Sequence, residues 1–112
     1  MNATEITQEL IKQLGDNKFL MMTGCKKLMF ADVTETNKNY WLRMNLMQNK
    51  SGANRLKIFL MGDDTYTMKF YHQTINKNFD CIITKEQTFE GVYHDMLQNI
   101  FTKVTGLYTK LF

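Results

Sequence analysis

Residues 40–71 read YWLRMNLMQNKSGANRLKIFLMGDDTYTMKFY, and this stretch decides the fold. At its start, apolar residues occupy every second position, which is the period of a strand with one face on a core. The same alternation returns after each of two polar turns, so the stretch predicts three strands of an antiparallel meander. The side chains expected to face the core are Tyr40, Leu42, Met44, Leu46, Leu56, Ile58, Leu60, Tyr66, Met68 and Phe70.

The second turn, Gly62-Asp63-Asp64, sets the pairing of the last two strands. With a three-residue loop, Leu60 lies opposite Tyr66 and Ile58 opposite Met68, whereas a two-residue loop would pair apolar with polar positions. Gly and Asp are ordinary turn residues. The adjacent carboxylates of Asp63 and Asp64 could also suggest a metal site. A two-metal site would need a further carboxylate from another strand, for which Asp32 is the only candidate, so we expect a turn.

Two helices are expected, one near each end of the chain. Thr4 to Leu14 carries apolar residues at helical spacing, with Asn2 or Thr4 as N-cap and Gly15 as C-cap. The second helix is expected from about Phe89 to Thr105, ending at Gly106.

Further strands are expected on both sides of the meander. Lys18 to Thr23 and Leu28 to Val33 predict a hairpin that turns at Gly24, and Asp80 to Lys85 predicts a weaker strand. The tail from Tyr108 to Phe112 is apolar enough to dock on the rest of the protein.

The 112 residues predict a single α+β domain that spans residues 1–112. We expect an antiparallel meander of about five to six strands, flanked by an N-terminal and a C-terminal helix packed on one face. Since 44% of the residues are hydrophobic and 22% are charged, the composition is that of a globular protein. No apolar run approaches the length of a membrane span, and Met1 to Glu9 lacks the pattern of a secretory signal, which predicts a cytoplasmic protein with no membrane partner.

The residues that could carry catalysis are scattered. Cys25 and Cys81 belong to no Cys-x-x-Cys pair and are expected to be small buried hydrophobes, although two neighbouring lysines could lower the pKa of Cys25. His72 and His94 have no other ligand at metal-binding spacing. Ser51, in a turn, lacks the elbow that exposes a nucleophile. We therefore expect no catalytic, metal or cofactor site and no enzymatic activity.

The outward face of the meander departs most from an ordinary surface. It is expected to interleave cations with large rings and to carry no acid, a mixture that single-stranded nucleic-acid platforms use. Alternatively, this face is covered by a second copy of the chain in a homodimer, by the fold itself or by another protein. The residues expected there are Trp41, Arg43, Met47, Arg55, Lys57, Phe59, Met61, Lys69 and Tyr71.

Three motifs resemble a group of small uncharacterised accessory proteins of tailed bacteriophages and prophages. They are Gly-x-Asn-Lys-Phe-x-x-Met-Thr-Gly from Gly15, Asp-x-Tyr-x-x-x-Phe from Asp64, and Met-Leu-Gln-x-x-Phe-Thr-x-x-Thr-Gly-Leu-Tyr-Thr from Met96. The resemblance implies a setting in the cytoplasm of a bacterial host and supplies no catalytic residues. It favours two classes of function, namely handling of nucleic acid and binding of a host protein.

The sequence thus predicts a non-catalytic protein that acts by binding to a host protein or to itself as a homo-oligomer, a dimer being expected. The alternative is a single-stranded nucleic-acid-binding protein that uses the basic and aromatic sheet face. In either case the binding residues are expected to be Trp41, Arg43, Arg55, Lys57, Phe59, Lys69 and Tyr71.

Overall fold

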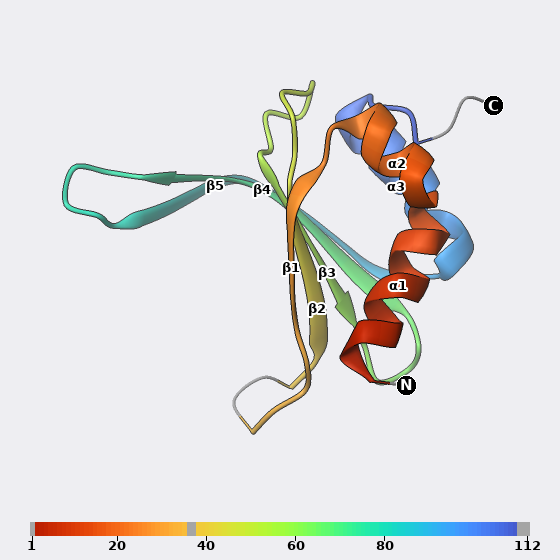
Figure 1. Ribbon diagram of the computed structural model, residues 1–112. Helices are drawn as coiled ribbons and strands as arrows, with labels where there is room; N and C mark the ends of the chain where they lie inside the picture. Colours follow the sequence, from red (N-terminus) through yellow and green to blue (C-terminus); the bar gives the residue numbers. More distant parts are fainter. Residues whose placement is uncertain (1, 36–37, 110–112) are drawn as a thin grey trace.

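The computed structural model describes residues 2–35 and 38–109 and shows an α+β fold with one open, five-stranded sheet (Figure 1). The strands are antiparallel and lie in the order β1-β2-β3-β4-β5, so each strand pairs with its neighbour in the chain. All the helices lie on one side of this sheet and leave its other face open (Figure 1). The elements are α1 (Ala3–Leu14), α2 (Asp16–Thr23), β1 (Lys26–Ala31), β2 (Tyr40–Asn45), β3 (Arg55–Leu60), β4 (Tyr66–Ile75), β5 (Cys81–Val92), the short 3₁₀ helix η1 (His94–Met96) and α3 (Leu97–Thr105).

The core lies between the helices and the inner face of β2, β3 and β4. The predicted alternation is confirmed, because the side chains expected to face inward are buried apart from half-buried Leu60. The predicted register is confirmed as well, with Leu60 opposite Tyr66 and Ile58 opposite Met68. The Met61 amide donates to the Thr65 carbonyl at 2.9 Å and closes the loop.

Helix α1 forms as expected and is capped at both ends. The Asn2 side chain accepts a hydrogen bond from the Glu5 amide at 2.9 Å, which satisfies one of the free amides at the helix start. Gly15 ends the helix at a φ of 126°, a conformation that favours glycine. Leu10 and Leu14 are fully buried, so α1 contributes one apolar side to the core.

The prediction of a strand over Lys18–Thr23 is wrong, because residues Asp16–Thr23 form α2. Gly24 therefore does not turn a hairpin; it caps α2 in the left-handed conformation at a φ of 66°. The physical reason is tertiary packing. Phe19 is fully buried and packs edge-on against Phe101 of α3, with ring centroids 5.0 Å apart.

The boundary between β5 and α3 also differs from the expectation. Strand β5 extends to Val92, whereas a helix was expected from about Phe89, and α3 begins only at Leu97. Val92 lies opposite Tyr66, and Phe89 lies opposite Met68 with its ring 6.0 Å from that of Phe70. These cross-strand contacts hold the segment in the sheet.

The docked tail is confirmed as far as Thr109. This residue is buried, and its hydroxyl donates a hydrogen bond to Gln98 Oε1 at 3.0 Å. Tyr108 is instead exposed. Residues 110–112 lie outside the described part of the chain.

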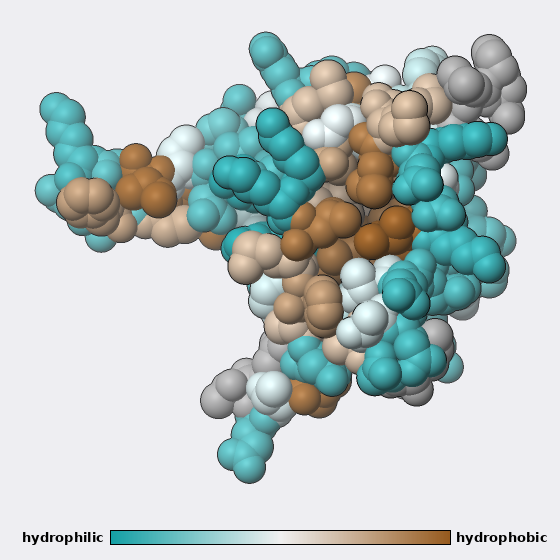
Figure 2. Space-filling view, in the orientation of Figure 1, coloured by the Kyte–Doolittle hydropathy of each residue, from teal (hydrophilic) through white to brown (hydrophobic). Residues whose placement is uncertain are grey.

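The distal parts of β4 and β5 leave the body of the protein as a two-stranded arm (Figure 1). We define the arm as residues 72–84. Its turn is tied by hydrogen bonds from the Asn78 and Asp80 amides to Asn76 Oδ1, at 2.9 and 3.0 Å. Hydrophobic residues are visible on the arm, well away from the main body (Figure 2).

Candidate functional site

The outward side chains of β2, β3 and β4 form three rows that cross the sheet. Strand pairing places the members of each row directly opposite one another. We call the first the aromatic row, the second the cationic row and the third the edge row. They comprise Trp41, Phe59 and Thr67; Arg43, Lys57 and Lys69; and Asn45, Arg55 and Tyr71.

The cationic row places three like charges on adjacent strands. Neighbouring strands lie about 4.8 Å apart, and like charges directly opposite one another destabilise a sheet. Burial lowers the pKa of Lys57 below its ordinary value of 10.5, and the positive charges of Arg43 and Lys69 lower it further. Within residues 2–35 and 38–109, none of the three cations forms an ion pair with a carboxylate. The row is therefore a concentration of positive charge that no carboxylate of the described residues neutralises.

Lys57 and Lys69 lie over the aromatic row. The Lys57 Nζ is 4.3 Å from the ring centroid of Trp41 and 5.1 Å from that of Phe59, and the Lys69 Nζ is 5.8 Å from the Phe59 centroid. Such cation–π contacts contribute about 0.5–1 kcal/mol each at exposed sites. Stacking of a base on a ring contributes about 1–3 kcal/mol, enough to displace a lysine toward a phosphate.

The edge row is less accessible than the sequence suggested. Tyr71 is only 8% exposed, so its ring is not a free stacking surface. Burial raises the pKa of Tyr71, and the charges of Arg43 and Arg55 oppose this shift. Arg43 also donates a hydrogen bond to the Met29 sulfur at 3.0 Å. Tyr71 therefore interacts with the guanidinium groups of Arg43 and Arg55 and does not offer its ring to a ligand.

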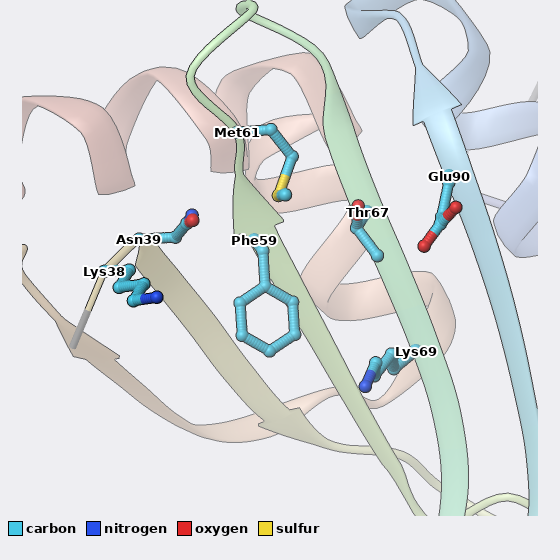
Figure 3. Close-up of a pocket in the computed structure, with 7 residues that line it drawn as sticks. All are labelled: Lys38, Asn39, Phe59, Met61, Thr67, Lys69 and Glu90. Atoms are coloured by element: carbon cyan, nitrogen blue, oxygen red, sulfur yellow. The ribbon is translucent and has the colours of Figure 1, made fainter. Parts of the chain in front are cut away.

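A pocket of about 310 Å³ opens at the end of the aromatic row (Figure 3). Phe59 lies in its middle, and its sides come from the segment before β2 and from β4 and β5. The lining residues are Lys38, Asn39, Phe59, Met61, Thr67, Lys69 and Glu90.

The structure thus brings together five of the seven residues predicted to bind, namely Trp41, Arg43, Lys57, Phe59 and Lys69. Arg55 and Tyr71 lie in the edge row beside them. Met61, also expected on this face, lines the pocket. Met47 follows β2 and packs against Gly24 instead.

Sequence reasoning missed four lining residues, Lys38, Asn39, Thr67 and Glu90. The expectation that the face carries no acid is incomplete, because the carboxylate of Glu90 contributes to the pocket. Glu90 falls within the helix expected from about Phe89, so the sequence did not predict its place on the sheet. One clue was available. Thr88 and Glu90 alternate with Phe89, which is a strand pattern, and this pattern lies beyond Lys85, where the strand was expected to end.

The arm carries the second unusual surface. Ile75 and Phe79 are 65% and 89% exposed, and Ile82 and Ile83 are exposed as well. Cys81 is exposed, so the expectation that it is buried is wrong. The reason is that this part of β5 pairs only with the equally exposed end of β4 and has no helix beneath it.

The other residues considered as catalytic or metal-binding candidates lie in surroundings that indicate a structural role. Thr65 donates two hydrogen bonds to Asp63 Oδ1, at 2.6 and 3.2 Å, and these bonds lower the pKa of Asp63. Asp63 therefore stabilises the turn. Cys25 is buried, and desolvation raises the pKa of its thiol to about 11, which is opposite to the lowering considered from its lysine neighbours. Within the described part of the chain, no three His, Cys, Asp or Glu residues form a group that could hold a metal ion.

The two histidines lie apart in different surroundings. His72 contacts the Gly52 carbonyl through Nδ1 at 3.0 Å. His94 is exposed and lies in η1, ahead of α3.

Comparisons with protein-family models, with curated proteins and with solved structures gave no match. The resemblance to phage accessory proteins therefore stays a prediction. Among the described residues, no helix is long and apolar enough to cross a membrane.

Proposed function

We propose that the protein is a non-catalytic binding protein whose open sheet face takes single-stranded nucleic acid. The observation that carries this proposal is the cationic row, Arg43, Lys57 and Lys69, which has no carboxylate partner in the described chain and lies beside two partly exposed rings. Phosphates would neutralise the row, while bases would stack on Trp41 and Phe59. The expected setting, the cytoplasm of a bacterial host, belongs to the same proposal.

Charge argues against the alternative that this face is closed by a second copy. A two-fold dimer places the same patch of both subunits in contact. Such a contact would bring Arg43, Lys57 and Lys69 of both subunits into one interface, with Glu90 of the pocket beside them. Like charges brought together in this way oppose association. A polyanion fits the face better than a second copy does.

Fluorescence anisotropy with a labelled single-stranded oligonucleotide tests the proposal. For single strands, log K falls against log salt with a slope of about −0.7 per neutralised phosphate, so four cations, Arg55 included, would give roughly −2.8. We expect Arg43→Glu with Lys57→Glu to abolish binding at low salt. Both side chains are partly exposed and lie on the outer face of the sheet, away from the core, so the fold should survive.

A matched control reverses two cations on the helical side, Lys18→Glu with Lys103→Glu, both of which are exposed. It changes the net charge equally and should retain most of the affinity. Equal losses in the two double variants would mean that only overall charge matters. Wild-type affinity that is absent at low salt or indifferent to salt would overturn the proposal.

The arm favours a second candidate function, self-association. An isolated two-stranded ribbon is marginally stable in water, and an exposed apolar strand edge promotes pairing with another chain. The outer edge of Cys81–Thr84 has no neighbouring strand in the described chain, and these four residues carry no charge. An identical edge from a second copy could pair with it antiparallel around a two-fold axis.

Light scattering after size-exclusion chromatography tests this second candidate. We expect a dimer for the wild type and a monomer for Ile83→Lys, because a charge would be buried at the new strand pair. Thr74→Lys is the control, since Thr74 is exposed on the same arm but belongs to β4, on the opposite side of the ribbon from the outer edge of Cys81–Thr84. A wild-type protein that stays monomeric at high concentration would refute self-association.

A further inference from the structure

We propose that the pocket beside Phe59 receives one unpaired base of the bound strand, and that Glu90 selects bases with an amino group on their pairing edge. The inference rests on the proposed function and deepens it, because it assigns base preference to one site. It predicts that cytosine is favoured over uracil at this position.

The position of the pocket suits a base. Phe59 provides a ring in the middle of the pocket, directly in line with Trp41 on the neighbouring strand. A strand whose bases stack on the aromatic row would therefore bring one base over Phe59. At about 310 Å³, the pocket is near the lower end of the usual range for ligand sites, roughly 300–1,000 Å³. This volume suits a single base.

The charges around the pocket are mixed in a way that matches a nucleotide. Lys38 and Lys69 contribute positive charge from opposite sides, and Glu90 contributes the carboxylate (Figure 3). Glu90 forms no ion pair within the described residues, although two lysines line the same pocket. A simple anion would meet repulsion from Glu90. A nucleotide instead offers phosphate to the lysines and a hydrogen-bond donor to the carboxylate.

The chemistry of a carboxylate sets the expected selectivity. An ionised carboxylate only accepts hydrogen bonds, and Asp or Glu accepts from the N4 amino group of cytosine. Uracil presents a carbonyl oxygen at the same place, which would repel Glu90. Asn39, whose amide points into the pocket, can donate or accept and does not discriminate by itself (Figure 3).

The test compares oligo(dC) with oligo(dU) of equal length at equal salt, because the two differ only at the base edge. A single discriminating contact predicts about five-fold tighter binding of oligo(dC), or more. In Glu90→Gln we expect the ratio to fall below about two-fold, since an amide side chain can pair with either edge. The same measurement with oligo(rC) and oligo(rU) shows whether the preference extends to RNA.

Glu86→Gln is the matched control, because Glu86 is an exposed glutamate of β5 that does not line the pocket. It removes the same charge and should keep the wild-type ratio. Equal wild-type affinity for oligo(dC) and oligo(dU), or a ratio unchanged in Glu90→Gln, overturns the pocket assignment and leaves the proposed function standing. Absence of binding to any oligonucleotide overturns both.

Discussion

The two faces of β2, β3 and β4 are made from alternate residues of the same strands, but they differ in burial and in charge. On the inner face, Leu42, Ile58 and Met68 lie in one row and are completely buried. On the outer face, the neighbouring row is Arg43, Lys57 and Lys69, and all three are partly exposed. The inner face is stabilised by burial, whereas the outer face keeps like charges side by side.

Because of this difference, we expect folding stability to depend on the inner face and binding to depend on the outer face. Burial of an apolar side chain contributes about 1.5–3 kcal/mol, while directly opposed like charges cost a few tenths to about 1 kcal/mol. The free energy gained by burial on the inner face can therefore offset the charge repulsion on the outer face. A core substitution should act on folding, and a substitution in the cationic row should act on binding.

The largest effect is expected at Phe70, an inner residue whose ring contacts those of Phe89 and Phe101. Phe70→Ala leaves a cavity and should lower the free energy of unfolding by about 3–5 kcal/mol. Its neighbour in β4 provides the comparison, because Lys69→Ala should change stability by under about 0.5 kcal/mol and weaken oligonucleotide binding. Urea denaturation and anisotropy measure the two quantities. Equal destabilisation by both changes would show that the two faces are not distinct.

The sequence predicted the two faces correctly because their pattern is local and repeated. Ile58 and Lys57 can be assigned to opposite faces from alternation alone, and the apolar match of Leu60 with Tyr66 fixes the register. These features need no knowledge of the rest of the fold. The centre of the candidate site was therefore predictable as well.

The sequence did not predict α2 or the end of β5, because contacts distant in the chain decide both. The run from Phe19 to Met22 has no clear period, and its helix depends on the packing of Phe19 against Phe101. Glu90 was misplaced for the same kind of reason. Its strand pairs with β4, about twenty residues earlier in the chain, so the acidic side of the pocket was hidden from local patterns.

An intermediate effect is expected for the two cysteines, which extend the comparison of buried and exposed positions. Cys25 is buried with a pKa of about 11, so at pH 8 only about one thiol in a thousand is ionised. Cys81 is exposed on the arm. In Ile83→Lys, in which no second copy covers the arm, we expect iodoacetamide to alkylate Cys81 at least about ten times faster than Cys25, as followed by peptide mass spectrometry. Rapid labelling of Cys25 would mean that the core opens, and Cys81→Ser should remove the fast phase.

Protection of Cys81 that is lost in Ile83→Lys would be informative in another way. It would mean that the arm is covered in solution by a second copy, as the self-association proposal requires. The labelling rate of Cys25 is the internal control, because it should be the same in both proteins.

The smallest effect is expected for Lys57→Met, which removes the central charge of the cationic row but keeps an unbranched apolar stem over Trp41 and Phe59. Contacts of the methionine sulfur with the two rings should replace the lost cation–π contacts. Relief of repulsion from Arg43 and Lys69 should then raise the free energy of unfolding by under about 0.5 kcal/mol, and less so in high salt. The variant should nevertheless bind oligonucleotides more weakly.

The pH dependence of this gain follows from the lowered pKa of Lys57. Between that pKa and the ordinary value of 10.5, the unfolded chain binds more protons than the folded one, so the wild type gains stability as pH rises through this window. The advantage of Lys57→Met should thus be complete at neutral pH and shrink toward pH 10.5. Urea denaturation of both proteins at several pH values measures it. An advantage that grows with pH would mean that Lys57 is stabilised by its surroundings, and the cationic row would then need no anion to relieve it.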